Sequence, residues 1–444
     1  MVASFEVFFR QFVDDDLGCA SYLIGDQAAA VAVVVDPAYA IEPYIADAER
    51  RGVRIVRVLE THTHADHVSG HGRLALEHGV PVSIHPLAEP EYPFDAIVDG
   101  EELSVGSVAI GVLHTPGHRP EHCCYLVDGH LLTGDSLLVG DAARPDLAIE
   151  ARDGAEALYG SLQKLAALPE ATGVYPGHVA GSLCATGISS DPSSTVGAEV
   201  RTNRALGFGD LQEFVAAHAT ISAPRPPTVE RVVALNRGPF LGAPAPLEPL
   251  ESFDGQVLDV RTPREFAAGH VRGALNVPVS GSSLGTKAGF LLDSERPVAI
   301  HASSREDAEI AAARLRAVGV LDLAGLLVEP QATERLEPIG LDEVERLLSE
   351  DAVELVDVRE KDERDEGYIP ESRHIPYRLV GEFANELANG RTVVTVCESG
   401  ARAAVAASVL AAHGVPARPV LDSGIQDWKR RGHALTEFRR CGSN

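Results

Sequence analysis

The first half of the chain alternates short apolar runs with amphipathic segments. The apolar runs are rich in β-branched residues and end at polar positions, as buried strands do. Strands are predicted at residues 28–35, 53–59, 105–113 and 124–127. Apolar residues recur at helical spacing in other segments. Helices are predicted at residues 41–51, 72–78 and 155–168. Strands that alternate with helices indicate an α/β fold.

A proline-rich stretch separates this half from the rest of the chain. Prolines recur between Pro224 and Pro249, and residues 238–249 are predicted to form an extended linker. A different pattern begins after it. We therefore place the first domain at residues 1–237.

The pattern after the linker occurs twice. "LDVRTPREFAAGHVRGALNVP" ends at Pro278 and "VDVREKDERDEGYIPESRHIP" ends at Pro376, so that the two Asp-Val-Arg triplets, two glycines and two prolines match at one constant offset. A constant offset indicates a duplicated unit. Each copy predicts a strand, a loop and a helix, repeated, which is typical of a small parallel sheet. The copies define domains at residues 250–335 and 338–444.

Composition and charge narrow the function classes. The chain has 444 residues, 45% of them hydrophobic, and a formal net charge of −27. Such a negative field disfavours binding to nucleic acids and to anionic membranes. The most apolar run, residues 27–35, is far shorter than the ~20 residues of a membrane span. Since the start also lacks a signal-peptide pattern, a cytoplasmic location is expected. Six cysteines are too few for a disulfide scaffold.

Histidines cluster directly after the strand predicted at residues 53–59. The segment Thr61–His67 reads T-H-T-H-A-D-H. In an extended segment alternate residues face the same side, so His62 and His64 can enter one site, and the next turn can bring Asp66 and His67 alongside. Three more ligand-type residues stand in turns of the same half: His118 in "TPGH", Asp135 in "TGDS" and His178 in "YPGH". Together these residues predict a metal site.

This constellation resembles the metallo-β-lactamase superfamily, whose H-x-H-x-D-H motif matches His62, His64, Asp66 and His67. The resemblance implies an αββα sandwich with metal at one edge. In the superfamily, one ion would be held by His62, His64 and His118, a second by Asp66, His67 and His178, with Asp135 as the bridge. All seven positions are filled, so the ligand count alone predicts two metal ions.

The segments 133–147 and 175–199 resemble the persulfide dioxygenase branch of that superfamily. This resemblance implies one Fe(II) per chain, bound by His62, His118 and Asp135. His64, Asp66, His67 and His178 would then orient the ligands and bind substrate or water. Two further residues are candidates near the metal: Tyr175 as a hydrogen-bond donor, and Cys184 as either a sulfur relay or a packing residue.

A second candidate site lies in the last domain. A strand-like run at residues 393–396 is followed by Cys397-Glu398-Ser399-Gly400-Ala401-Arg402 and a helical stretch at 403–412. Backbone N–H groups and the helix dipole would lower the pKa of such a thiol and stabilise a persulfide anion. Gly400 permits a tight loop and Arg402 adds positive charge. Cys397 is therefore the candidate nucleophile.

Residues 338–444 resemble the rhodanese sulfurtransferase domain, with Cys397 as the residue that carries the persulfide. In the middle copy the corresponding position is Ala302, beside His301, and residues 250–335 contain no cysteine. We interpret that copy as a degenerate rhodanese domain with a structural or docking role. A different reaction at His301 is the alternative.

The expected architecture is an αββα metallo-β-lactamase sandwich followed by two small parallel-sheet α/β rhodanese domains. It implies a sulfide-detoxification enzyme that oxidises a low-molecular-weight thiol persulfide with O₂ to sulfite and transfers sulfane sulfur through Cys397, with thiosulfate as product or substrate. A fused pair of activities raises the effective concentration of reactive persulfides. Self-association into a homo-oligomer is a further expectation. Two alternatives are a two-zinc thioester hydrolase of the glyoxalase II kind and a non-catalytic sulfur carrier or sensor. The identity of the thiol carrier stays open.

Overall fold

The computed structural model describes residues 7–146, 148, 150–179, 189–219 and 224–437. Its chain divides into two compact units. Unit 1 comprises Met1–Pro244 with Arg316–Gly319, and unit 2 comprises Ala245–Leu315 with Val320–Asn444. The expected order of an αββα sandwich and two parallel-sheet α/β domains is confirmed.

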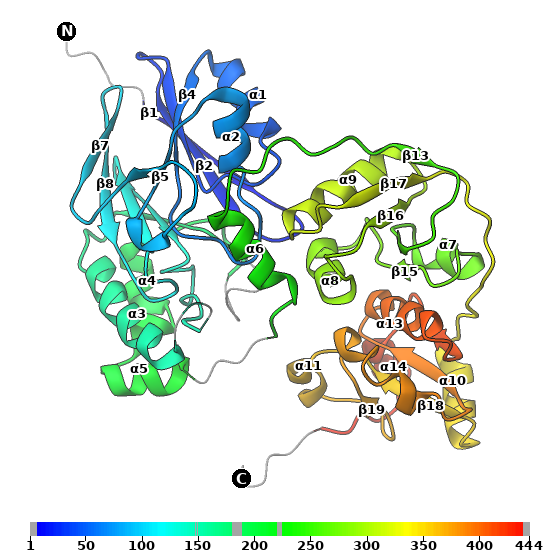
Figure 1. Ribbon diagram of the computed structural model, residues 1–444. Coiled ribbons are helices and arrows are strands. Elements are labelled where there is room, and N and C mark those ends of the chain that lie inside the picture. The colour runs from blue at the N-terminus through cyan, green and yellow to red at the C-terminus, as the bar shows by residue number, and fades with distance from the viewer. Residues whose placement is uncertain (1–6, 147, 149, 180–188, 220–223, 438–444) are drawn as a thin grey trace. The chain divides into compact units, whose positions relative to one another are not determined.

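Unit 1 contains two six-stranded sheets (Figure 1). The first, in spatial order, consists of β1 (Val7–Val13), β2 (Ala20–Asp26), β3 (Val31–Val35), β4 (Arg54–Leu59), β5 (Val82–Ile84) and β6 (Asp95–Ala96). The second consists of β12 (Ser194–Thr195), β11 (Gly173–Pro176), β10 (His130–Gly134), β9 (Cys123–Val127), β8 (Val108–His114) and β7 (Glu102–Val105). Both sheets mix parallel and antiparallel pairs.

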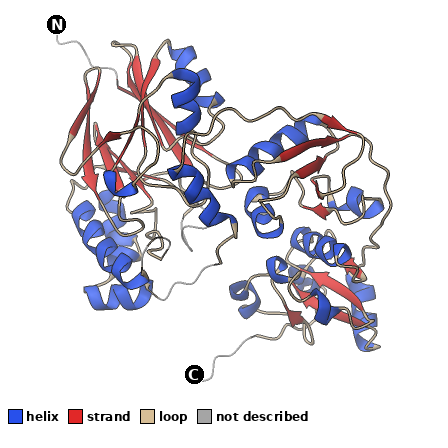
Figure 2. Cartoon of the chain, in the orientation of Figure 1, coloured by secondary structure: helices blue, strands red, loops and turns tan. Residues whose placement is uncertain are grey.

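Helices cover the outer face of each sheet (Figure 2). On the first sheet lie α1 (Glu42–Arg51) and α2 (His71–His78), with the short η1 (Pro86–Ala88) after β5. On the second lie α3 (Ala151–Ala166), α4 (Val196–Thr202), η2 (Ala205–Gly207) and α5 (Leu211–His218); α6 (Thr228–Arg237) follows. Side chains of both sheets, among them Tyr22 and Tyr125, form one buried cluster between them. Apolar burial on both faces of each sheet stabilises this sandwich.

Two of the predicted strands are corrected by the structure, and one carboxylate explains both. Residues 28–30 form a turn, because Asp26 Oδ1 accepts hydrogen bonds from the backbone N–H groups of Ala28 and Ala29. The segment 105–113 is a hairpin rather than one strand. Its turn is held by Asp26 Oδ2, which accepts from the N–H and hydroxyl of Ser107. Gly106 and Ser107 interrupt the apolar pattern at this turn, and the sequence prediction missed this short turn signal.

Unit 2 contains two parallel sheets. The first sheet, in spatial order, consists of β13 (Pro249–Leu250), β17 (Leu323–Leu327), β16 (Val298–His301), β14 (Gln256–Asp259) and β15 (Leu275–Asn276). Its helices are α7 (Pro263–Ala268), α8 (Leu284–Leu291) and α9 (Arg305–Ala317). Residues 239–248, most of the predicted linker, contain no helix or strand. The expected domain boundaries stay predictions.

The second sheet of unit 2 consists, in spatial order, of β19 (Arg373–His374), β18 (Val353–Asp357), β20 (Thr392–Val396) and β21 (Ala417–Pro419). Its helical segments are α10 (Leu341–Ser349), α11 (Lys361–Asp365), η3 (Tyr377–Leu379), α12 (Ala384–Leu387), α13 (Ala401–Ala412) and α14 (Ile425–Arg430). Between the two sheets, the backbone N–H of Asn276 donates to the Ser408 hydroxyl at 2.9 Å, and both residues are fully buried.

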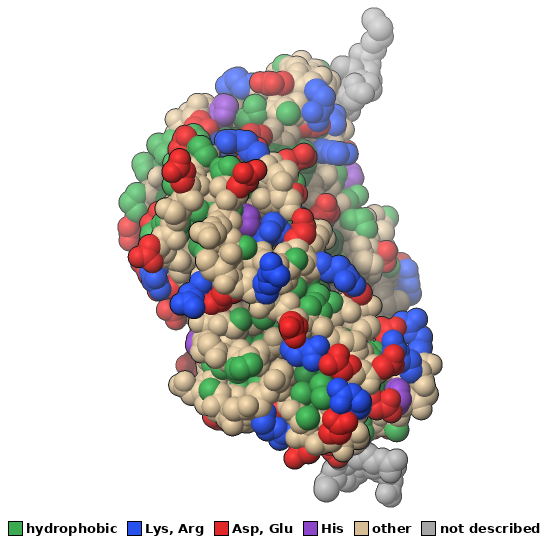
Figure 3. All heavy atoms as spheres, turned by 90° about the vertical axis from the view of Figure 1, so that its right-hand side faces the viewer, with side chains coloured by type: hydrophobic (Ala, Val, Ile, Leu, Met, Phe, Trp, Pro, Cys, Tyr) green, Lys and Arg blue, Asp and Glu red, His purple; other side chains and the backbone are tan. Residues whose placement is uncertain are grey.

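The surface carries both signs of charge. On the face shown in Figure 3, Lys and Arg side chains are interspersed with Asp and Glu. The excess of acidic over basic residues in the sequence does not form a single negative patch on this face. In the described part of the chain, every helix is too short or too polar to cross a membrane.

The core under α3 offers a test of the sandwich. Leu158 is fully buried with Leu131 and Phe214. We expect Leu158→Ala to lower the free energy of unfolding by about 2–5 kcal/mol, because the cavity left behind collapses only in part. Urea denaturation followed by circular dichroism measures this loss. Leu76→Ala is the control, since Leu76 is 58% exposed; equal losses in both variants would contradict this packing.

Candidate metal centre and cysteine loop

Three predicted metal ligands converge in unit 1. His62 follows β4, His118 follows β8 and Asp135 follows β10, and all three are at most 1% exposed. Asp135 Oδ2 lies 3.9 Å from His62 Nε2 and 3.6 Å from His118 Nε2. Within the described residues, none of these three atoms has a hydrogen-bond partner. Buried polar atoms are rarely left unpaired, so these three fit one shared cation.

Hydrogen bonds on the far side of each ring set which nitrogen faces the centre. The Thr61 hydroxyl donates to Asp36 Oδ2 at 2.8 Å and accepts from His62 Nδ1 at 2.9 Å. His118 Nδ1 donates to the carbonyl of Arg144 at 2.8 Å. Each Nε2 therefore keeps its lone pair, as a ligand must. Burial and neighbouring histidines also lower the pKa of His62 well below its usual value, which keeps the ring neutral.

His178 lies beside this triad, but both of its ring nitrogens face carboxylates. Its Nδ1 contacts Asp135 Oδ1 at 2.6 Å and its Nε2 contacts Asp66 Oδ2 at 2.6 Å. Burial opposes ionisation of Asp135, but His178 outweighs it and holds the pKa of that carboxyl below its usual range. Because His178 occupies Oδ1 of Asp135, only Oδ2 of that carboxylate faces His62 and His118.

His64 contacts two carboxylates, and its ring centroid lies 4.3 Å from that of His62. Its Nε2 lies 3.3 Å from Asp36 Oδ1 and 3.2 Å from Glu60 Oε2. Burial and the nearby His67 lower the pKa of His64, but these two carboxylates outweigh both and raise it to about 9. A charged His64 balances two buried carboxylates. Both histidines therefore contact carboxylates, and their expected supporting role stays a prediction.

Cys19 is a residue that the sequence analysis missed. Its Sγ lies 3.3 Å from Asp66 Oδ2, 3.4 Å from His67 Nδ1 and 3.3 Å from His178 Nε2. These four side chains form a second group of ligand-type atoms beside the triad. Cys19 stands near the start of the chain with no histidine close to it in sequence. An isolated backbone bridge between Cys19 and His178 brings it to this group, so no local pattern in the sequence indicates it.

His122 was missed for a similar reason. It is fully buried, and its Nε2 accepts a hydrogen bond from the backbone N–H of Asp135 at 3.0 Å. Burial lowers the pKa of His122 to about 3, so it stays a neutral acceptor. It positions the backbone that carries the central carboxylate.

The two secondary candidates are not placed at the metal. Cys184 lies outside the described residues. The ring of Tyr175 packs on Phe9 and His130, with centroid distances of 4.6 and 5.3 Å. Its role near the metal is not supported by these contacts and stays a prediction. Cys123 and Cys124 are buried, and burial raises the pKa of the Cys124 thiol to about 12, as suits a packing residue.

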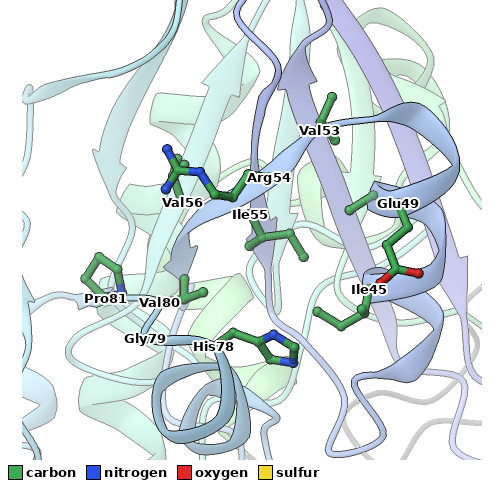
Figure 4. A pocket seen from close by; sticks show the side chains of 11 residues that line it. Ile45, Glu49, Val53, Arg54, Ile55, Val56, His78, Gly79, Val80 and Pro81 are labelled. Atoms are coloured by element: carbon green, nitrogen blue, oxygen red, sulfur yellow. The ribbon is translucent and has the colours of Figure 1, made fainter.

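A separate cavity of about 370 Å³ opens between α1, β4 and α2 (Figure 4). Glu49, Arg54 and His78 line it together with apolar side chains. It lies on the outer side of the first sheet and contains none of the predicted site residues.

The cysteine loop of unit 2 follows the predicted pattern. Cys397 comes directly after β20 and is 1% exposed, and α13 begins at Ala401. The backbone N–H of Gly400 donates to Cys397 Sγ at 3.1 Å, and Gly400 adopts a φ of +95° that other residues rarely accept. The backbone N–H of Ile425 donates to the carbonyl of Cys397 at 3.1 Å. Neighbouring backbone thus encloses the thiol.

Arg402 is held by a carboxylate from another element. Its two terminal nitrogens contact Glu363 of α11 at 2.5 and 2.6 Å, a bidentate pair. Burial alone would lower the pKa of Arg402, but Glu363 outweighs it and raises it. The rest of the loop is more open, and Glu398 is 35% exposed at its side chain and lies 3.6 Å from Arg359.

The middle copy lacks both the cysteine and the arginine of the Cys397 loop. Asp259 pairs with His301 across β14 and β16, whereas Asp357 pairs with Val396 across β18 and β20. His301 therefore occupies the position of Val396, and Ala302 that of Cys397. His301 Nδ1 lies 3.1 Å from Asp259 Oδ2 at the edge of a cavity of about 430 Å³. Without a thiol this copy cannot carry a persulfide.

The hydroxyl of Thr61 provides a test of the metal centre. Thr61→Val removes the hydroxyl between Asp36 and His62 Nδ1, so we expect the affinity for a divalent metal ion to fall about 10–100-fold. Titration against a competing chelator measures it. Thr202→Val on the exposed surface of α4 should leave the affinity unchanged; an unchanged affinity for Thr61→Val as well would argue against His62 as a ligand.

The contact between Gly424 and the cysteine loop provides a test of the loop geometry. A Cβ at Gly424 would come within 2.1 Å of the Glu398 carbonyl and 2.2 Å of the Cys397 carbonyl, so Gly424→Ala must displace the loop. We expect loss of persulfide loading on Cys397, measured by mass spectrometry. Gly340→Ala is the matched control, since a Cβ there meets nothing within 4 Å. Full loading in Gly424→Ala would refute this geometry.

Comparison with known proteins assigns the first part of the chain and the remainder to two different domain families. The model of the metallo-beta-lactamase superfamily matches residues 14–178, and the model of the rhodanese-like domain matches residues 247–328 and 340–431. The bovine mitochondrial persulfide dioxygenase ETHE1 is 30% identical over 237 residues, which cover 52% of this chain and 87% of that protein. A hydroxyacylglutathione hydrolase from Alkalilimnicola ehrlichii is 38% identical over 163 residues, 35% of this chain and 60% of that protein.

Among solved structures, a metallo-beta-lactamase from Staphylococcus aureus subsp. aureus COL matches with a TM-score of 0.68 and 28% identity. The match covers 74% of this chain and all of that chain, so the similarity extends past unit 1. The chain belongs to the metallo-β-lactamase superfamily, as a fusion of a domain homologous to the ETHE1 persulfide dioxygenases with two rhodanese-like domains.

Proposed function

We propose that this chain is a bifunctional enzyme of sulfide detoxification. Its first domain oxidises a low-molecular-weight thiol persulfide with O₂, and its last domain transfers sulfane sulfur through Cys397. Homology to persulfide dioxygenases and the two rhodanese-like domains support a role in sulfur metabolism. Tethering suits this pair of activities, because it raises the effective concentration of a reactive intermediate between two sites.

The observation that carries the proposal is the set of unpartnered atoms at the triad. His62 Nε2, His118 Nε2 and Asp135 Oδ2 are buried without hydrogen-bond partners in the described part of the chain, as are both ring nitrogens of His64 and Nε2 of His67. Both ring nitrogens of His178, in contrast, contact carboxylates. Two histidines and one carboxylate are the ligand set of non-heme Fe(II) oxygenases, and they leave coordination positions open. Bound Fe(II) would supply the binding and activation of O₂ and of the persulfide sulfur, which redox-inactive Zn²⁺ does not.

The protein's own residues prepare the site for that ion. Thr61 and the Arg144 carbonyl fix the two rings with Nε2 inward. His178 balances the charge on Oδ1 of Asp135 and leaves Oδ2 for the metal. In the overall reaction the terminal sulfur takes both oxygen atoms of O₂ and one from water. It leaves as sulfite with release of two protons, and the inner sulfur remains as the parent thiol.

At the second site Cys397 acts as the nucleophile. Its thiolate attacks the terminal sulfur of a persulfide, the S–S bond to the carrier breaks, and the carrier leaves as a thiolate. The sulfane sulfur changes partners without net oxidation. The N–H of Gly400 stabilises the anionic sulfur. Transfer to sulfite would give thiosulfate as product, and transfer in the other direction would feed persulfide to the iron.

A second candidate function is hydrolysis of thioesters by two zinc ions. It is favoured by the hydroxyacylglutathione hydrolase relatives and by the presence of all seven ligand types. It requires His64 and His178 to leave their carboxylates and bind metal. A non-catalytic sulfur carrier is a weaker alternative, because it gives the complete, buried ligand set no role.

Metal content and O₂ uptake test the proposal. We expect anaerobically purified protein to contain about one iron per chain and to consume O₂ when glutathione persulfide or coenzyme A persulfide is added. His118→Ala should lose iron and O₂ uptake but keep sulfur transfer, since it alters only unit 1. Cys397→Ser should lose sulfur transfer but keep iron and O₂ uptake.

Each variant is thus the control for the other. Two zinc ions per chain without O₂ uptake would refute the dioxygenase and favour thioester hydrolysis. Loss of both activities in Cys397→Ser would show that the sites do not work independently.

A further inference from the structure

Arg402 of the Cys397 loop and three other arginines of the same domain each contact a carboxylate. The pairs are Arg359 with Asp357, Arg364 with Asp357, Arg378 with Glu360 and Arg402 with Glu363. Glu398, the residue after the cysteine, adds a fourth carboxylate 3.6 Å from Arg359. Each of these positive side chains is therefore already paired.

Arg402 is the cation that matters most for a ligand on Cys397. It belongs to the loop itself and interacts electrostatically with the cysteine. Its side chain is 21% exposed, whereas that of Arg359 is 3% exposed and tied to Asp357. Both terminal nitrogens of Arg402 are occupied by Glu363. An anion that approaches Cys397 must therefore compete with the Glu363 carboxylate for this guanidinium.

The middle copy shows that Glu363 does more than cap its helix. Glu265, at the equivalent position, also closes a capping box at the start of α7, with Thr262. Where the active copy has Arg402, the middle copy has Asp307, and Glu265 accepts a hydrogen bond from Ser303 instead. Both copies use the glutamate as a cap. Only the copy with a reactive cysteine also pairs it with an arginine.

We propose that Glu363 determines the donor specificity of the Cys397 site by neutralising Arg402, so that the site favours organic persulfides over dianionic thiosulfate as sulfur donors. The proposal rests on the sulfur-transfer function proposed above. At the sulfur that Gly400 and the loop receive, a persulfide brings one negative charge. Thiosulfate brings two, and the paired site offers no uncompensated cation for the second.

The chemical step is the same for both donors. The Cys397 thiolate attacks the sulfane sulfur, the sulfur–sulfur bond of the donor breaks, and a Cys397 persulfide anion forms. An organic persulfide releases a thiolate, and thiosulfate releases sulfite, with no net oxidation in either case. The donors differ in the charge that the site must accommodate, which is where Glu363 acts.

Glu363→Gln in the full-length protein tests this role. Gln keeps the capping interaction of α11, so folding should be retained. We expect the kcat/KM for thiosulfate, relative to that for glutathione persulfide, to rise about tenfold, because Arg402 becomes free to bind the dianion. In Glu363→Gln/Arg402→Gln the gain should vanish. Glu366→Gln, which removes an exposed carboxylate at the end of the same helix, should leave the ratio unchanged.

The dependence of kcat/KM on ionic strength provides a second test, which is made first on the unaltered protein. The kcat/KM of the unaltered protein for thiosulfate should not fall between low and physiological ionic strength, because no net positive field attracts the dianion. In Glu363→Gln it should fall. A steep fall in the unaltered protein, or an unchanged donor ratio in Glu363→Gln, would overturn the inference. If neither donor loads Cys397 in the unaltered protein, the proposed sulfur transfer itself fails.

Discussion

The metal centre depends on how the charge of one fully buried carboxylate is shared. Asp135 is 0% exposed, and burial of an ionised carboxylate requires compensating partners. Oδ1 of Asp135 contacts His178 Nδ1 at 2.6 Å. Oδ2 faces Nε2 of His118 at 3.6 Å and Nε2 of His62 at 3.9 Å. Neither Nε2 can donate a hydrogen bond to it, because each ring carries its proton on Nδ1. Such an arrangement is costly without a cation and favourable with one. The hydrogen bonds made by Thr61, the Arg144 carbonyl and His178 orient His62, His118 and Asp135 around this buried charge.

Both candidate sites use the same feature of α/β topology. His62, Asp135 and His178 follow β4, β10 and β11, and Cys397 follows β20, each at the carboxyl end of a strand that has a parallel neighbour. Loops at that edge converge, whereas the helices that cover the sheets stay at a distance. The sandwich can therefore gather ligands that are far apart in sequence, and the small rhodanese sheet can hold a six-residue loop against the start of a helix.

Patterns that are local in sequence predicted much of this structure, and patterns that arise only in space did not. The H-x-H-x-D-H segment and the Cys397 loop are contiguous, so their residues and spacing show in the sequence. Cys19, Asp36 and His122 contact the metal centre through strand pairing and through backbone contacts that no local period encodes. The orientation of His64 was also missed, since it depends on Asp36, which follows β3, as well as on Glu60, which lies four residues before it. The hairpin at residues 105–113 was missed because its turn is held from another strand by Asp26.

The two rhodanese-like copies separate the framework from the chemistry. In each copy the aspartate at the end of the first central strand binds the arginine two residues later. That arginine also reaches a glycine carbonyl: Arg261 contacts Gly269 at 2.9 Å, and Arg359 contacts Gly367 at 2.7 Å. This contact persists where no cysteine is present, so it stabilises the turn that follows the strand. The cysteine and the loop arginine are absent together from the middle copy, where Ala302 and Asp307 stand instead. A positive charge beside a thiol stabilises its anion, whereas an alanine at the same position needs none.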